Sequence, residues 1–199
     1  MAREWEQRAM GKGRLEAFSD GVIAVIITIM VLELKVPNGT DVASLAPLLP
    51  IFLSYVLSFV FVGIYWNNHH HLLHAVQRLD GLALWANLHL LFWLSLVPFL
   101  TRWMSETHFA SIPVALYGYD LLMAGLAYYV LARILVKGRG NLALAQALGR
   151  DYKAIASMVI CGAAVALSFW NVWLACGLYV LIAIIWFIPD SRIEHNVAQ

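Results

Sequence analysis

An arginine, a serine and an aspartate stand at the start of an otherwise apolar segment, RLEAFSDGVIAVIITIM, which covers residues 14–30. An ionisable side chain inside a membrane costs several kcal/mol unless it is paired or hydrated, and it usually faces a bundle interior or a water-filled cavity. In one interpretation, Ser19 and Asp20 form hydrogen bonds with Arg14 and with groups at the ends of the second and third helices. In the other, Asp20 forms an ion or proton site, and the residues alone leave both open.

A second polar stretch, WNNHHHLLHAVQRLDG, covers residues 66–81 and contains four histidines: His69, His70, His71 and His74. His70 and His74 are four residues apart, so they could share zinc or iron on one helical face, as in a membrane metalloenzyme. Membrane di-iron enzymes need several such groups, and here the remaining histidines are scattered. We therefore expect hydrogen-bonded histidines at the membrane interface, with no bound metal or cofactor. A pH-responsive role stays open because histidine titrates near neutrality.

A third candidate is Asp120, which lies inside the apolar segment LYGYDLLM. An ionisable side chain inside a membrane is costly unless it has a partner or water, and Tyr117, Tyr119 or a neighbouring helix could supply the partner. The sequence contains no GxSxG nucleophile motif, no HExxH zinc motif, no P-loop and no dinucleotide-binding fingerprint. We therefore predict that the protein is not an enzyme.

The composition indicates which elements carry these side chains. The 199 residues are 62% hydrophobic and 13% charged, whereas an ordinary soluble domain is about 25% charged. Runs long enough to cross a bilayer as helices, about 20 residues each, cover 15–35, 47–66, 82–103, 112–136, 152–169 and 171–188. The sequence therefore predicts an all-α membrane protein with six transmembrane helices in one domain, residues 1–199.

The distribution of lysine and arginine predicts the orientation. If the N-terminus is inside, eleven of the thirteen basic residues lie on the inner side, and only Lys35 and Arg102 lie outside. Cytoplasmic loops retain positive charge, so we expect both termini to be cytoplasmic. A formal net charge of +1 gives no support for a broad surface that binds nucleic acid.

The first helix carries two stripes when its residues are placed at 100° intervals. Small residues on one stripe would let helices approach closely in a membrane, and the other stripe could face a pore lined by copies of the helix, lipid or a neighbouring helix. The small stripe consists of Ala17, Gly21, Ala24 and Thr28, and the larger one of Glu16, Asp20, Ile23, Ile27, Met30 and Leu34.

The segment RLEAFSDGVIAV resembles the Arg-x-x-x-Phe-Ser-Asp signature of the transmembrane protein 175 family of potassium channels, which occur in lysosomes and in many prokaryotes. The similarity continues in WNNHHHLL, RLDGLALWAN and LFWLSLVPFLT, so it covers the first three helices. One six-helix unit per chain is similar to the prokaryotic form. That form assembles as a homotetramer, and we expect this chain to do so in the cell membrane.

The resemblance implies a passive, potassium-preferring pore surrounded by four copies of the first helix. The constriction would be formed by Ile23, Ile27 and Met30, and an apolar ring of this kind can close a pore by expelling water. The signature residues, together with a histidine and an asparagine, would hold the first three helices together: Arg14, Phe18, Ser19, Asp20, His70 and Asn87. His71 replaces an expected arginine and Met30 an expected leucine, and the last three helices carry no matching motif.

Three other functions remain open from the residues. Asp20, Asp120 or the histidines could conduct protons, the cluster His69–His74 could serve a membrane metalloenzyme, and the protein could be a membrane scaffold without flux. Glu33, near the outer end of the first helix, would either attract cations to the pore or be an ordinary solvated side chain.

Overall fold

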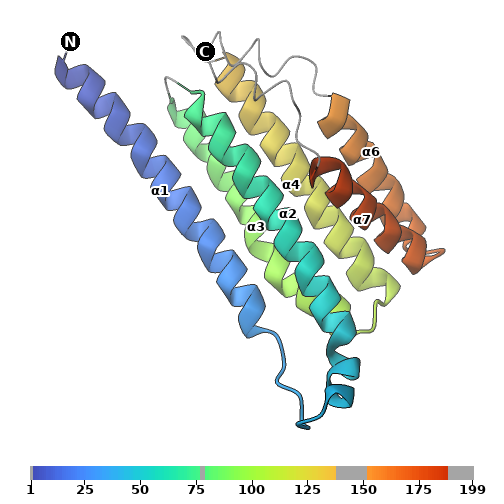
Figure 1. Cartoon of the computed structure of the whole chain (residues 1–199). Helices are drawn as coiled ribbons and strands as arrows, with labels where there is room; N and C mark the ends of the chain where they lie inside the picture. Colours follow the sequence, from blue (N-terminus) through green and yellow to red (C-terminus); the bar gives the residue numbers. More distant parts are fainter. Residues whose placement is uncertain (1, 77–78, 138–151, 188–199) are drawn as a thin grey trace.

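The computed structural model describes residues 2–76, 79–137 and 152–187, with side chains from residue 11 onward. These residues form an elongated bundle of helices that run alternately up and down (Figure 1). The elements are α1 (Ala2–Leu32), the 3-10 helix η1 (Val42–Leu48), α2 (Leu49–His74), α3 (Gly81–Glu106), α4 (Ser111–Lys137), α6 (Tyr152–Leu167) and α7 (Val172–Phe187). The predicted all-α class is confirmed, with six α-helices in the described part of the chain.

Four segments are long and apolar enough to cross a membrane: Gly11–Leu32, Val42–His74, Gly81–Glu106 and Ser111–Lys137. Helices α6 and α7 are shorter but also apolar. The predicted second span ended at residue 66, but α2 continues to His74. The difference arises because hydropathy measures which residues suit hydrocarbon, whereas the backbone helix continues wherever its hydrogen bonds do.

Short sequence signals set several helix boundaries. Asp80 caps α3, because its Oδ1 accepts a hydrogen bond from the backbone N–H of Ala83 at 2.8 Å. Asp41 caps η1 in the same way through Ser44, at 3.1 Å. Pro50 occupies the first turn of α2, where a missing N–H breaks no helical hydrogen bond.

Helix α1 lies at the edge of the bundle and packs mainly against α3 and α2, whereas α3 and α4 form the most extensive pair (Figure 1). One apolar core joins α1, α2, α3 and α4 and includes Leu72, Leu90 and Leu131. A second core joins α4, α6 and α7 with parts of α2 and α3, around Tyr117 and Tyr179. The chain therefore has a central layer with α1 on one side and the α6–α7 pair on the other.

Close packing of α7 on α4 depends on Gly118. A Cβ at this position would lie 1.9 Å from Tyr179 Oη, so no larger residue fits without moving α7. The same hydroxyl donates a hydrogen bond to the carbonyl oxygen of Val114 at 3.2 Å. The glycine thus allows a buried tyrosine to find its polar partner on the neighbouring helix.

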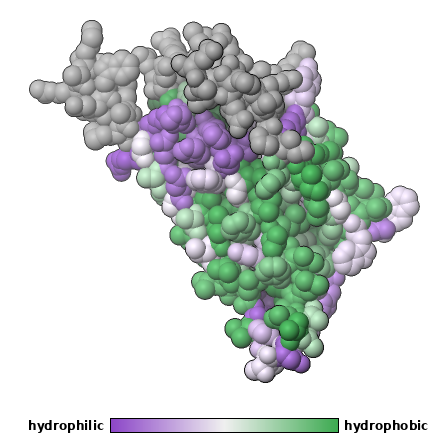
Figure 2. Space-filling view, viewed as in Figure 1, coloured by the Kyte–Doolittle hydropathy of each residue, from purple (hydrophilic) through white to green (hydrophobic). Residues whose placement is uncertain are grey.

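The surface has an apolar middle and more polar ends. Figure 2 shows hydrophobic residues over the length of the helices, with hydrophilic residues gathered toward the end where α1 starts. We call this end the N end, and the opposite one, where α1 stops and α3 reaches Arg102, the far end. Such an apolar surface suits contact with lipid.

Candidate functional site

Helix α1 has a buried inner face and an exposed outer face within the single chain. The inner face consists of Leu15, Ser19, Ile23, Ile26 and Met30. The outer face consists of Ala17, Phe18, Gly21, Ala24, Val25, Thr28, Ile29 and Leu32. The outer face therefore combines the predicted stripe of small residues with bulky aliphatic side chains.

The stripe predicted to form a constriction does not lie on this outer face. Ile23 is 1% exposed and Met30 2% exposed, both within the core that α1 shares with α2, α3 and α4. Ile27 is half-buried beside the same core. Because residues 21–32 of α1 are apolar on nearly all sides, their periodicity fixes the angle between side chains but not the side that meets the rest of the chain.

A buried polar cluster of Ser19, His69 and Asn87 joins the first three helices. The Asn87 Nδ2 group on α3 donates to Ser19 Oγ on α1 at 2.9 Å, and Asn87 Oδ1 lies 2.6 Å from His69 Nε2 on α2. An amide oxygen only accepts, so His69 donates through Nε2–H. All three side chains are almost fully buried. In the structure, Ser19 is thus hydrogen-bonded to the third helix, and Asn87 occupies the centre of the cluster.

The histidine of this cluster is His69, whereas the family resemblance implied His70. The ring of His70 stacks on Trp66 and His74 at centroid distances of 5.9 and 6.1 Å, on an exposed side of α2. The buried residues of α2 include Val62 and Leu73, and His69 follows Val62 by seven residues, two helical turns. The spacing agrees with the buried position of His69, but α2 is apolar on nearly all sides, so the sequence alone did not indicate which histidine faces the bundle.

The other signature residues do not join the polar cluster. Asp20 is half-buried, and its Oδ1 accepts a hydrogen bond from Trp66 Nε1 on α2 at 3.0 Å. Phe18 and Arg14 are exposed on the outer side of α1. Arg14 makes no hydrogen bond or ion pair with the side chains that the structure describes. In place of Arg14, the structure gives Asp20 a partner in Trp66 and Ser19 a partner in Asn87, both of which are distant along the chain.

An ion-pair cluster of Glu33, Lys35, Arg102 and Glu106 connects α1 and the residues after it to α3 at the far end. Arg102 Nη1 lies 2.5 Å from Glu33 Oε2, and its Nε lies 3.3 Å from Glu106 Oε1. Lys35 Nζ lies 3.0 Å from the same Glu106 oxygen. Two positive and two negative groups balance, so Glu33 is neither an isolated attractor of cations nor simply solvated.

Asp120 is buried on α4, with 1% exposure. Neither of its carboxyl oxygens has a hydrogen-bond partner in the described part of the chain. Tyr117, one expected partner, instead hydrogen-bonds Ser58 at 3.0 Å. Tyr119, the other, is exposed and packs its ring on Trp93.

The histidines of residues 69–74 were considered as possible metal ligands. No group of three or more histidine, cysteine, aspartate or glutamate side chains is placed to hold a metal ion among residues 11–76, 79–137 and 152–187. His69 contributes to the polar cluster, while His70 and His74 stack along the exposed side of α2. The cluster His69–His74 is therefore divided between two different surroundings.

Comparison with known proteins gives three consistent results. A family model described as endosomal/lysosomal potassium channel TMEM175 matches residues 14–98, beginning at the signature arginine. A potassium channel from Chryseobacterium sp. (strain P1-3) is 53% identical over 191 residues, which cover 96% of this chain and 100% of that protein. The endosomal/lysosomal proton channel TMEM175 from Homo sapiens is 38% identical over 96 residues, 42% of this chain and 19% of that protein.

A similar solved structure extends the likeness to the whole bundle. The crystal structure of a lysosomal potassium-selective channel TMEM175 homolog from Chamaesiphon minutus aligns with a TM-score of 0.77 and 30% sequence identity. The alignment covers 90% of this chain and 97% of that one. With the high identity of the Chryseobacterium relative over nearly its full length, these findings show that the chain belongs to the TMEM175 family.

Proposed function

We propose that the protein is a passive, potassium-preferring cation channel in which four copies assemble around a pore lined by α1. The Chryseobacterium relative is named a potassium channel, and the Chamaesiphon structure is that of a potassium-selective channel homolog. The observation that carries the proposal is the division of α1 into two faces. Its inner face is fixed to α2 and α3 by buried contacts, which leaves an apolar outer face free for other copies.

The proposed constriction uses the outer face of α1 in place of the stripe containing Ile23 and Met30. Val25, Ile29 and Leu32 are exposed bulky side chains on that face, and the last is 81% exposed. Four copies of such side chains would form narrow apolar rings, which close a pore by expelling water until the helices move apart. The neighbouring small residues would let the four α1 helices approach one another closely.

The proposed orientation places the N end of the bundle in the cytoplasm. Lys12, Arg133, Lys137 and Lys153 belong to this end, where α1 and α6 start and α4 stops. Cytoplasmic segments near membrane helices are enriched in such residues. Arg78 and the basic residues of 138–151 and 188–199 lie outside the described residues. They support this orientation only through the count of lysine and arginine in the sequence.

The decisive experiment is the reversal potential of the purified protein in a planar bilayer, with potassium on one side and sodium on the other. We expect the reversal potential to shift toward the potassium equilibrium potential. A shift toward the sodium potential would contradict potassium preference, and a complete lack of current would favour a scaffold. Native mass spectrometry of the same preparation tests the tetramer, and a monomer or dimer would contradict a pore lined by four copies of α1.

Proton conduction is a second candidate, because the human relative is named a proton channel. In this chain Asp20 is half-buried beside the exposed ring of Trp66, which stacks on His70 at the N end. Current driven by a pH gradient alone, in symmetrical potassium, would support it. Metal analysis of the same sample tests the metalloenzyme alternative, which requires zinc or iron in stoichiometric amount.

A further inference from the structure

The far end of α1 is less enclosed by the rest of the chain than its middle. Ile23 and Ile26 are buried, whereas Val31 is 45% and Leu32 81% exposed at the end of the helix. Only Met30 still reaches the core there. In the last turn of α1, Met30 is therefore the one side chain that packs in the apolar core. Other contacts must define the position of this turn.

Hollows lie on both sides of this last turn. One is lined by Met30 and Leu34 together with Tyr55 of α2 and Thr101 of α3. The other is an open groove between Ile29 of α1 and Ser95 and Phe99 of α3. Glu33 and Arg102 line both. Within the single chain, other side chains do not fill these hollows, so apolar contacts alone do not fix the last turn of α1 against α3.

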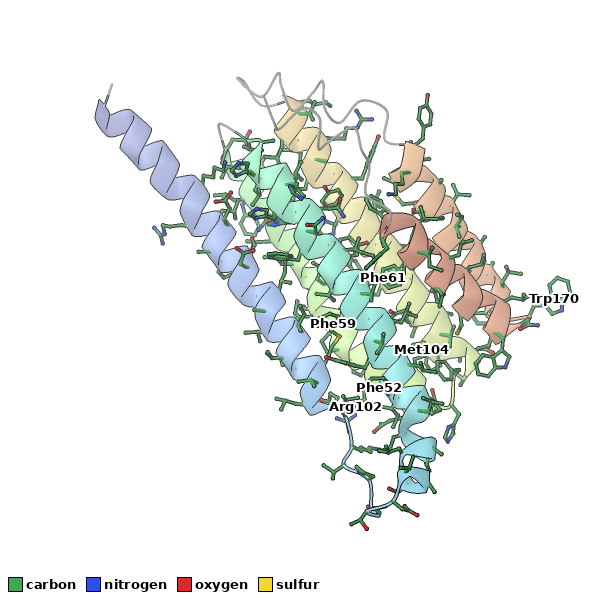
Figure 3. All side chains as sticks on the ribbon, in the orientation of Figure 1. Phe52, Phe59, Phe61, Arg102, Met104 and Trp170 are labelled. Atoms are coloured by element: carbon green, nitrogen blue, oxygen red, sulfur yellow. The ribbon has the colours of Figure 1, made fainter. Side chains whose placement is uncertain are left out.

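The ion-pair cluster is the polar contact that spans this loosely packed region. Figure 3 shows Arg102 of α3 at the tip of α1, where the blue helix ends. Arg102 has one pair with Glu33 across the helices and one with Glu106 one turn along its own helix. The guanidinium can hold both carboxylates at once because its N–H groups point outward in a rigid planar fork.

We propose that Glu33 and Arg102 are positioning residues that hold the far end of α1 against α3 and thereby keep the pore narrow at Ile29 and Leu32. This inference rests on the proposed function, in which α1 lines the pore. Arg102 and Glu33 are half-exposed, with 50% and 34% of their side chains accessible. Exposed ion pairs are weak and are screened by salt. The cluster therefore biases the position of α1 and can be broken by thermal motion.

The test compares Glu33→Gln with Glu16→Gln in single-channel recordings. Glu33→Gln removes the charge that joins α1 to Arg102 but keeps the length and polarity of the side chain. We expect a roughly two- to fivefold rise in open probability, the range that one exposed ion pair supplies. Glu16 pairs with Lys12 at 3.9 Å within α1, so Glu16→Gln removes the same charge without releasing one helix from another, and open probability should stay unchanged.

A conservative variant distinguishes positioning from general damage. Arg102→Lys keeps the positive charge but cannot engage both carboxylates with a planar fork. We expect its open probability to lie between that of the wild type and that of Glu33→Gln. An open probability equal to that of the wild type in both variants would overturn the proposal.

The dependence of open probability on ionic strength is a second test, because a purely structural role of Glu33 would not make open probability depend on salt. Raising salt from about 0.1 M to about 1 M with impermeant N-methyl-D-glucamine chloride shortens the Debye length from about 10 Å to about 3 Å. At constant potassium, the open probability of the wild type should rise toward that of Glu33→Gln. The variant should respond little, and an equal response in both proteins would contradict the proposal.

Hydrogen exchange measured by mass spectrometry tests the contact without any current. Amides of residues 26–34 should exchange faster in Glu33→Gln than in the wild type, while peptides from α4 should not change. Unchanged exchange at 26–34 would overturn the positioning role. If the wild type carries no potassium current, the channel function fails, and faster exchange in the variant would still support the contact between α1 and α3.

Discussion

The two ends of α1 are attached to the rest of the chain by different kinds of contact. Near the N end, Ser19 and Ile23 are buried, and neutral hydrogen bonds connect Ser19 through Asn87 to His69. At the far end, Glu33 meets Arg102 through an exposed ion pair beside unfilled space. A buried, fully bonded cluster fixes one geometry because breaking it leaves polar groups unsatisfied. An exposed ion pair costs little to open, so one helix combines a fixed part with an adjustable part.

Replacing isoleucine by alanine on each of the two faces of α1 should give the largest difference in stability and conductance between two variants. Ile23→Ala removes a side chain from the core and should destabilise the assembly by about 2–5 kcal/mol. Ile29→Ala acts on the exposed outer face, so it should raise unitary conductance or loosen ion selectivity with a smaller loss of stability. Thermal dissociation of the purified assembly and single-channel currents measure the two effects. A larger change in conductance for Ile23→Ala than for Ile29→Ala would return the constriction to the stripe first predicted from the sequence.

Disrupting the polar cluster of Ser19, His69 and Asn87 should give the next largest loss of stability. Asn87→Ala leaves both Ser19 and His69 without their shared partner, at about 1–3 kcal/mol for each buried group left unsatisfied. The temperature of dissociation should fall, and high salt should not change the size of the fall. Asn67→Ala is the matched control, because Asn67 is exposed on α2. Equal losses in the two variants would mean that the buried cluster does not secure α1.

The contact between Asp20 and Trp66 should contribute less. Trp66→Phe keeps an aromatic ring for stacking on His70 but removes the indole N–H that donates to Asp20. One hydrogen bond contributes about 0.5–1.5 kcal/mol, and the loss should appear as a modest decrease in the dissociation temperature. If Asp20 instead conducts protons, the variant should alter current under a pH gradient more than it alters stability.

The smallest effect on stability should come from the far end. Glu33→Gln should cost less than about 1 kcal/mol, the usual limit for an exposed ion pair. Its dissociation temperature at high salt should equal that of the wild type, because salt already screens the pair. A loss as large as that of Asn87→Ala would remove the distinction between a fixed and an adjustable end.

Sequence patterns predicted much of the fold because hydrophobic length is a local property. Six apolar runs predicted six helices, and the aspartate before Gly81 caps the helix that follows it. The contribution of Ser19 and Asn87 to joining the first three helices was also predicted, on the family resemblance. The structure places His69 rather than His70 beside Asn87, because adjacent positions on α2 differ by about 100° and His69 is the one that points into the bundle.

The partners of Asp20 and Glu33 were not predicted. Trp66 follows Asp20 by 46 residues, and Arg102 follows Glu33 by 69. No local sequence pattern indicates these pairs, because each depends on how α1 and the residue after it lie against another helix in the folded chain. The same holds for Asp120, whose two candidate tyrosines lie on its own helix but have other contacts.

The sequence by itself determined that the chain enters a membrane as helices, where those helices lie along it, and which residues of α1 are separated by which angles. Composition and spacing suffice for these properties, because lipid requires long apolar segments with all backbone hydrogen bonds made internally. Only the tertiary structure decided that Ile23 faces the core while Val25 and Ile29 face outward. A helix that is apolar on all sides carries no local record of its orientation, so the packing of α2 and α3 against it makes that choice.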